Sequence, residues 1–100
     1  MNAIKIELPK EAIAGICKRY QVRELSVFGS AVRDDFTDQS DIDFLVEFMP
    51  DAKIGLLEFI GMQHELADIL GRKVDLVSKR GLNPIIRDEV LNSSKVFYAA

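Results

Sequence analysis

Residues 27–48 read VFGSAVRDDFTDQSDIDFLVEF, and this stretch decides the fold of the chain. It consists of a Gly29-Ser30 turn, a polar run, and an alternating segment that opens with Asp41-Ile42-Asp43. Since successive side chains of a strand point to opposite faces, Asp41 and Asp43 share one face and lie about 7 Å apart along the backbone. The stretch therefore predicts two strands joined by a polar loop, with a turn and two carboxylates brought together.

The two aspartates form a pattern that is typical of metal ligands. Two like charges placed so close repel each other unless a cation lies between them. Mg²⁺ prefers oxygen ligands, and proteins usually bind it through one or two carboxylates together with substrate phosphates. Two such ions about 3.5–4 Å apart can clamp the attacking and leaving oxygens of a phosphoryl displacement. We therefore expect one or two Mg²⁺ ions at Asp41 and Asp43.

The Gly29-Ser30 turn is suited to hold phosphate. Ser30 can open a helical turn that runs to about Arg33, and the unpaired N–H groups and dipole of a helix N-terminus attract phosphate. Arg33 would add a charged donor. Each motif alone also has a plain explanation, an ordinary turn or a solvated strand edge. Their combination at this spacing favours a site for phosphate and metal.

The rest of the chain predicts a mixed α+β fold with a small mixed or antiparallel sheet. The connection between the first two strands is too short for a full βαβ crossover, which argues against an all-parallel sheet. Helices are expected mainly on one face of the sheet, leaving the aspartate face open. We expect a single domain over residues 1–100, with helices at 9–20, 53–70 and 82–92 and strands at 22–28, 41–48, 73–77 and 95–98.

The composition limits the classes to which the chain can belong. Hydrophobic residues make up 48% and charged residues 29%, which is typical of a soluble globular domain. A net charge of −3 is not the strongly basic balance of a duplex-binding protein, so no direct binding to duplex nucleic acid is expected. The single cysteine excludes an internal disulfide and fits a reducing cytoplasm. No segment reaches the roughly 18 apolar residues of a membrane span.

The string GSAVRDDFTDQSDIDFLVEF, residues 29–48, resembles the signature of the DNA polymerase β-type nucleotidyltransferase superfamily. It is similar in particular to the small stand-alone members, the minimal nucleotidyltransferases (MNT). The resemblance implies the nucleotidyltransferase fold and a Mg²⁺-dependent transfer of AMP from ATP to a hydroxyl group. The chain departs from the common GSxARG pattern at Val32 and Asp34, and neither departure removes a ligand. Asp34 and Asp35 add negative charge beside an anionic substrate.

The resemblance also implies roles for individual residues. Gly29-Ser30 corresponds to the turn that holds the nucleotide phosphates, and Asp41 and Asp43 correspond to the Mg²⁺ ligands. Asp75, within KVDLV at residues 73–77, matches the third carboxylate of the family triad. It would serve as a metal ligand or as the general base on the attacking hydroxyl.

The family implies a partner protein. Stand-alone MNT proteins are often encoded beside a HEPN-domain protein that acts as an RNase-like toxin, and the MNT protein is then the antitoxin. The implied reaction adenylylates a tyrosine of the partner, and the oligomeric state, homo- or hetero-oligomer, is left open. Two alternatives stay open: an antitoxin that neutralises its partner by binding alone, and transfer to a small molecule. The short chain disfavours the small-molecule acceptor, and no residue can be assigned to reading the base.

The remaining notable side chains have structural interpretations. His64 lies off the apolar stripe of its helix and is expected to be exposed, pairing with the aspartate one turn later. Cys17 is expected in the core. Lys79-Arg80 and Arg87 would meet the triphosphate or an acidic partner, or form a solvated face. Glu47 shares the face of the aspartates but lies too far along the strand to bind the same metal, so we expect it on the surface.

Overall fold

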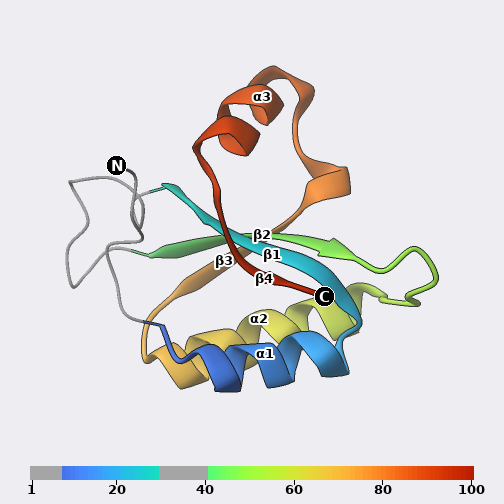
Figure 1. Cartoon of the computed structure of the whole chain (residues 1–100), viewed down its shortest axis with the longest axis vertical. Helices are drawn as coiled ribbons and strands as arrows, with labels where there is room; N and C mark the ends of the chain where they lie inside the picture. The colour runs from blue at the N-terminus through green and yellow to red at the C-terminus, as the bar shows by residue number, and fades with distance from the viewer. Residues whose placement is uncertain (1–7, 30–40) are drawn as a thin grey trace.

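The computed structural model describes residues 8–29 and 41–100 (Figure 1). Ser30 and Arg33, with the helical turn predicted between them, lie outside the described residues. In the described ranges, no helix is long and apolar enough to cross a membrane. The elements are helices α1 (Lys10–Arg19), α2 (Leu56–Leu70) and α3 (Pro84–Ser93), the short 3₁₀ helix η2 (Lys79–Gly81), and strands β1 (Val22–Phe28), β2 (Ile42–Phe48), β3 (Val74–Ser78) and β4 (Lys95–Ala99).

The four strands form one mixed sheet in the order β3-β2-β1-β4. β1 pairs antiparallel with both β2 and β4, whereas β2 and β3 are parallel. Parallel neighbours need a crossover connection, and α2 provides it. The mixed sheet predicted from the sequence is therefore confirmed.

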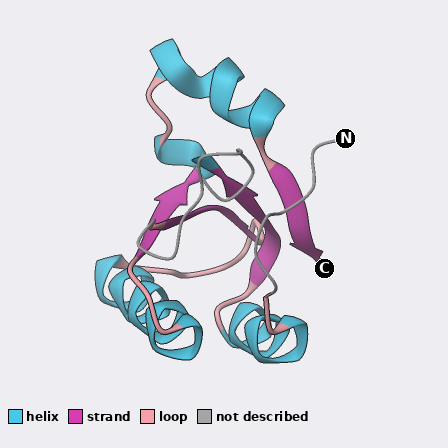
Figure 2. Cartoon of the chain, turned by 90° about the vertical axis from the view of Figure 1, so that its left-hand side faces the viewer, coloured by secondary structure: helices cyan, strands magenta, loops and turns pink. Residues whose placement is uncertain are grey.

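The main core lies between the sheet and the pair α1 and α2, which Figure 2 shows below the sheet. Alternation along β2 directs every second side chain towards this pair, and helical periodicity supplies the facing apolar residues. Cys17 is fully buried there, as predicted. The main members of this core are Ile13, Ile16 and Cys17 of α1, Met62 and Leu66 of α2, and Ile42, Phe44 and Val46 of β2.

The opposite face of the sheet is not left open along its whole length, contrary to our expectation. Leu45, which shares this face with Asp43, is only 4% exposed and belongs to a second cluster with Leu82 and Val90. Figure 2 shows α3 on this side of the sheet, across from α1 and α2. Burying an apolar side chain on this face is favourable, and the segment after β3 provides the residues that cover Leu45. α3 thus covers the middle of this face, while Asp43 and Asp75 at the start of β2 and β3 lie on its open part.

Local hydrogen bonds set where two helices begin. We predicted that α2 starts at residue 53, but it starts at Leu56, because the Glu58 carboxylate accepts a hydrogen bond of 2.7 Å from the Gly55 N–H. This contact satisfies a backbone donor that the first turn leaves unpaired. At α3 the Asn83 side chain accepts a bond of 2.9 Å from the Ile85 N–H, so the helix starts at Pro84 instead of residue 82.

One carboxylate fastens α1 to α2. Glu65 of α2 accepts hydrogen bonds from the Arg19 guanidinium and from the Tyr20 hydroxyl. The hydrogen bond from Arg19 lowers the pKa of Glu65 most, and the bond from Tyr20 lowers it further. The bond between Tyr20 and Glu65 also raises the pKa of Tyr20. The two helices are therefore joined by charge-assisted bonds outside the apolar core.

Candidate active site

Two of the predicted carboxylates lie side by side on neighbouring strands. In the parallel register of β2 and β3, Asp43 is the direct partner of Asp75. The preceding pair, Ile42 and Val74, is buried against the main core, so both aspartates belong to the opposite face. Adjacent strands are about 4.8 Å apart, which brings the two carboxylates within reach of one bound cation. The structure thus assembles Asp43 and Asp75 across a long stretch of sequence.

Gly29 connects the turn to this pair of carboxylates. It follows the last residue of β1, Phe28, which is the strand partner of Asp43. Its φ of +71° lies in the left-handed region that L side chains rarely adopt. A Cβ atom placed at Gly29 would lie 2.1 Å from Oδ2 of Asp43, which is far inside van der Waals contact. The glycine backbone therefore lies directly against the Asp43 carboxylate, and both its conformation and its missing side chain are required.

Asp41 lies just before β2, two residues from Asp43. Its Oδ2 atom is 3.9 Å from Nζ of Lys73, and the Ile42 N–H donates a bond of 3.1 Å to the carbonyl of Lys73. Sequence reasoning missed Lys73. The signal was available in principle, because a parallel register of Ile42 with Val74 puts the preceding residues opposite each other. With side chains that are 73% exposed for Lys73 and 42% exposed for Asp41, such a pair contributes little to stability.

The three aspartates do not form a closed cage. In residues 8–29 and 41–100, no group of three histidine, cysteine or acidic side chains converges closely enough to hold a metal ion by itself. Mg²⁺ rarely uses such cages, since it keeps water and phosphate oxygens beside one or two carboxylates. The all-oxygen donors Asp43 and Asp75, against the bare backbone of Gly29, fit an ion that is bound jointly by protein and nucleotide. The metal roles predicted for Asp41, Asp43 and Asp75 remain predictions, as do the phosphate roles of Ser30 and Arg33.

A cavity of about 290 Å³ adjoins Asp75 along the edge of the sheet. His64 and Asp68 of α2 line it together with Lys73, and His64 is exposed as predicted. In the same stretch of α2, the side chain of Gln63 accepts a bond of 3.0 Å from the Leu76 N–H. The helix thus covers part of the open edge of β3, while the cavity remains accessible beside the aspartate.

The basic residues singled out in the sequence gather elsewhere. Lys79, Arg80 and Arg87 line a larger groove at the far ends of β2 and β3. Glu47 lies in the same groove, half-buried, with Oε1 3.4 Å from Nζ of Lys79, so it is a paired residue and not a solvated surface carboxylate. The four residue steps from Asp43 to Glu47 span roughly 13 Å of strand.

Comparison with known proteins identifies the class. The sequence model of the nucleotidyltransferase domain matches residues 10–97, from the first residue of α1 into β4. The chain therefore belongs to the nucleotidyltransferase domain family, and the resemblance and enzyme class predicted from the sequence are confirmed. The site at Gly29, Asp43 and Asp75 lies within the matched residues.

Relatives narrow the membership to the minimal nucleotidyltransferases. The chain is 43% identical over 74 residues to the protein adenylyltransferase MntA of Thermococcus cleftensis, covering 74% of this chain and 73% of the relative. A solved structure described as a candidate minimal nucleotidyltransferase superposes with a TM-score of 0.71 at 36% identity, covering 86% of both chains.

More distant structures share the fold. A toxin–antitoxin complex with AMP-PNP gives a TM-score of 0.76 at 21% identity, covering 93% of this chain and 75% of that chain. A tri-AMPylated HEPN toxin of Shewanella oneidensis in complex with its MNT antitoxin gives 0.67 at 20% identity, covering 91% and 70%. At such identities the likeness establishes the fold alone.

Proposed function

We propose that the chain is a Mg²⁺-dependent adenylyltransferase that transfers AMP from ATP to a hydroxyl group, a tyrosine of a HEPN-type partner, and thereby acts as an antitoxin. One observation carries the proposal: Gly29 lies in contact with the Asp43 carboxylate, and Asp75 is the register partner of Asp43. A phosphate-binding turn is useful to a transferase only beside the carboxylates that hold the metal and the acceptor. The relative named protein adenylyltransferase MntA and the AMPylated toxin in complex with its MNT antitoxin support the choice of AMP and of a protein acceptor.

Each residue of the site has a separate role in the proposed reaction. Gly29 lets the phosphates approach the backbone, and Ser30 and Arg33 donate hydrogen bonds to them. Asp75, which is exposed on the open part of the sheet, accepts the proton of the acceptor hydroxyl as its oxygen attacks the α-phosphorus and pyrophosphate leaves. Asp41 and Asp43 would hold Mg²⁺, which neutralises phosphate charge when bound.

The contact of Asp41 with Lys73 is compatible with this role. The contact is long and exposed, so exchanging the lysine for a divalent ion sacrifices little stability. Lys73 would then lie within reach of the negative charge of the substrate. The buried free thiol of Cys17 suits the reducing cytoplasm in which we place the reaction.

The direct test uses ATP labelled at the α-phosphate, Mg²⁺ and a HEPN-domain protein from the same genome as the candidate partner. We expect label on the partner with the native chain and a loss of at least about a hundredfold with Asp43→Asn. Asp51→Asn, a matched change in the exposed turn after β2, should leave labelling unchanged. Equal labelling by the native chain and Asp43→Asn would refute the proposed chemistry.

The second candidate is an antitoxin that neutralises its partner by contact alone. It is favoured by large apolar side chains that the described fold leaves exposed, Leu56, Leu57 and Ile85, which suit contact with a protein partner. It predicts that the double variant Asp41→Asn, Asp43→Asn still protects cells from the partner. Protection that disappears together with labelling would exclude it.

A further inference from the structure

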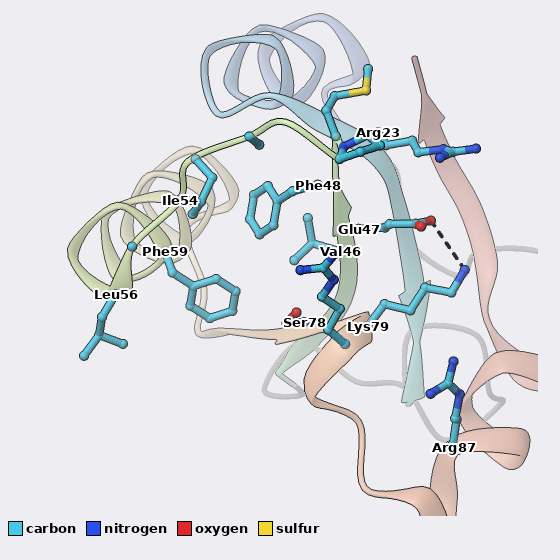
Figure 3. Close-up of a pocket in the computed structure, with 15 residues that line it drawn as sticks. Arg23, Val46, Glu47, Phe48, Ile54, Leu56, Phe59, Ser78, Lys79 and Arg87 are labelled. Carbon is cyan, nitrogen blue, oxygen red and sulfur yellow. Dashed lines mark hydrogen bonds and ion pairs between the residues drawn. The ribbon is translucent and has the colours of Figure 1, made fainter.

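A second concave surface lies at the end of the sheet away from the carboxylates. It is a groove of about 890 Å³ at the far ends of β2 and β3, bordered by the segment before α2 and by α3, and we call it the basic groove. Figure 3 shows that its two sides differ, with apolar side chains on one side and basic ones on the other. The residues that define it are Ile54, Leu56 and Phe59 on the apolar side and Arg23, Lys79 and Arg87 on the basic side, with Arg80 also in its lining.

The charge of the basic groove opposes that of the molecule. Four cationic side chains against one carboxylate, Glu47, give its lining a formal charge of +3, whereas the whole chain carries −3. Glu47 is already paired with Lys79. Within the part of the chain that the structure describes, Arg23, Arg80 and Arg87 have no ion-pair partner. Three arginines gathered in one groove of an acidic protein create a local field that attracts an anionic ligand.

The apolar side of the groove provides an anchoring point. Leu56 borders the groove at the first residue of α2 and is 74% exposed, and the half-buried rings of Phe48 and Phe59 line the apolar side further in. An exposed leucine beside aromatic rings gains free energy when a second apolar side chain covers it. A ligand that fits both sides is therefore anionic along one side and apolar along the other.

A polypeptide fits this description better than a nucleotide. The rings of Phe48 and Phe59 pack edge to face on each other, with centroids 6.3 Å apart and an interplanar angle of 66°, and so do not offer parallel faces between which a base could insert. The one carboxylate in the groove is held by Lys79, which leaves no acidic pair for the Mg²⁺ that accompanies a nucleoside triphosphate. An acidic segment of a protein needs neither feature.

We propose that the basic groove docks an acidic segment of the partner protein that carries an apolar anchor residue. The identity of the partner rests on the proposed function, whereas the preference for an acidic, apolar-anchored segment does not. Because the groove lies roughly 13 Å along the strands from Asp43, docking there leaves the carboxylates accessible. Binding energy gained at such a remote site holds the acceptor hydroxyl near the reacting phosphate and lowers the KM for the partner.

The test begins with the chain alone and a defined probe, a short fluorescein-labelled peptide of glutamate and aspartate around one leucine. Its anisotropy should rise on binding, and two-dimensional ¹⁵N NMR should place the shifts at Val46, Phe48 and Ser78 and not at Asp43. Arg87→Glu should weaken binding about five- to tenfold, since it replaces an attraction by a repulsion. Lys10→Glu, the same change outside the groove on α1, should not.

A matched pair tests the apolar side. Leu56→Ser should weaken binding of the peptide about tenfold, whereas Leu57→Ser should leave it unchanged, because Leu57 is equally exposed but does not line the groove. Substituting serine for the leucine of the peptide should reproduce the effect of Leu56→Ser. Leu56 and Leu57 are both exposed, so Leu56→Ser and Leu57→Ser should leave the protein folded.

Three results would overturn the proposal: no binding of the acidic peptide, binding that is unaffected by Arg87→Glu and Leu56→Ser, or groove shifts produced by oligouridylate or ATP but not by the peptide. Each is independent of the labelling experiment, because the peptide contains no acceptor hydroxyl. With the partner protein, Arg87→Glu should raise the KM for transfer about fivefold or more and leave kcat unchanged, which separates a docking defect from a catalytic one.

Discussion

Replacing Gly29 by alanine tests whether the turn and the carboxylate act as one unit. The new Cβ would meet Oδ2 of Asp43 at 2.1 Å and Cγ at 3.1 Å, while real Cβ atoms essentially never come closer than 3.0 Å. The carboxylate oxygen must therefore retreat by about 0.9 Å, the difference between 3.0 and 2.1 Å. A misplacement of about 1 Å in a reacting constellation costs on the order of a hundredfold in rate. The φ of +71° adds about 1–2 kcal/mol of backbone strain.

Gly71→Ala is the control, because it isolates the strain from the steric effect. Gly71 has a φ of +65°, and no heavy atom lies within 4 Å of the position of its Cβ. Both variants should therefore lose about 1–2 kcal/mol of stability from backbone strain in thermal or urea unfolding. Gly29→Ala alone should lose about a hundredfold in the rate of AMP transfer. If the two variants transfer AMP at similar rates, the contact between Gly29 and Asp43 has no part in catalysis.

Three further predictions concern the scaffold. Gly15→Ala should stabilise the protein by about 0.5–1 kcal/mol in urea unfolding. Gly15 lies inside α1, and a Cβ atom at this position would meet no heavy atom within 4 Å. A loss of stability would contradict the described helix. Glu65→Gln should lower the melting temperature at neutral pH. Folding lowers the pKa of Glu65, so the stability that its carboxylate contributes is present above the unfolded pKa of about 4.3 and is lost as the pH falls through the folded pKa. The difference in melting temperature between the native protein and Glu65→Gln should therefore shrink below about pH 4. Burial raises the pKa of Cys17 to about 11, so the thiol should react with Ellman's reagent only after unfolding, and fast reaction of the native protein would show that α1 is not packed as described.

The alternating pattern of β2 predicted much of the fold and the site. Ile42, Phe44 and Val46 are buried together, and Asp43 lies on the other face beside Asp75. Patterns of this kind are local, so they reveal which face a side chain occupies. They do not reveal what covers that face, and the burial of Leu45 under α3 was missed for this reason.

Contacts between distant segments account for the rest. The pairing of Lys73 with Asp41 depends on the register of β3, and the assembly of Arg23 with Arg87 depends on the path of the chain after β3. Two apolar residues of α2, Leu56 and Ile60, stay exposed in the described fold. Local periodicity does not determine a tertiary register or which apolar side chains stay exposed.

The parallel pairing of β2 with β3 also bears on how the protein comes to be active. Asp43 and Asp75 are neighbours in space but are separated along the chain by all of α2, so their pairing closes a long loop. Contacts of large sequence separation carry a high entropy cost and form late in folding. A nascent chain that ends before β3 would contain Gly29, Asp41 and Asp43 but would lack Asp75. In the proposed reaction, which needs Asp75, AMP transfer is therefore possible only after the sheet is complete.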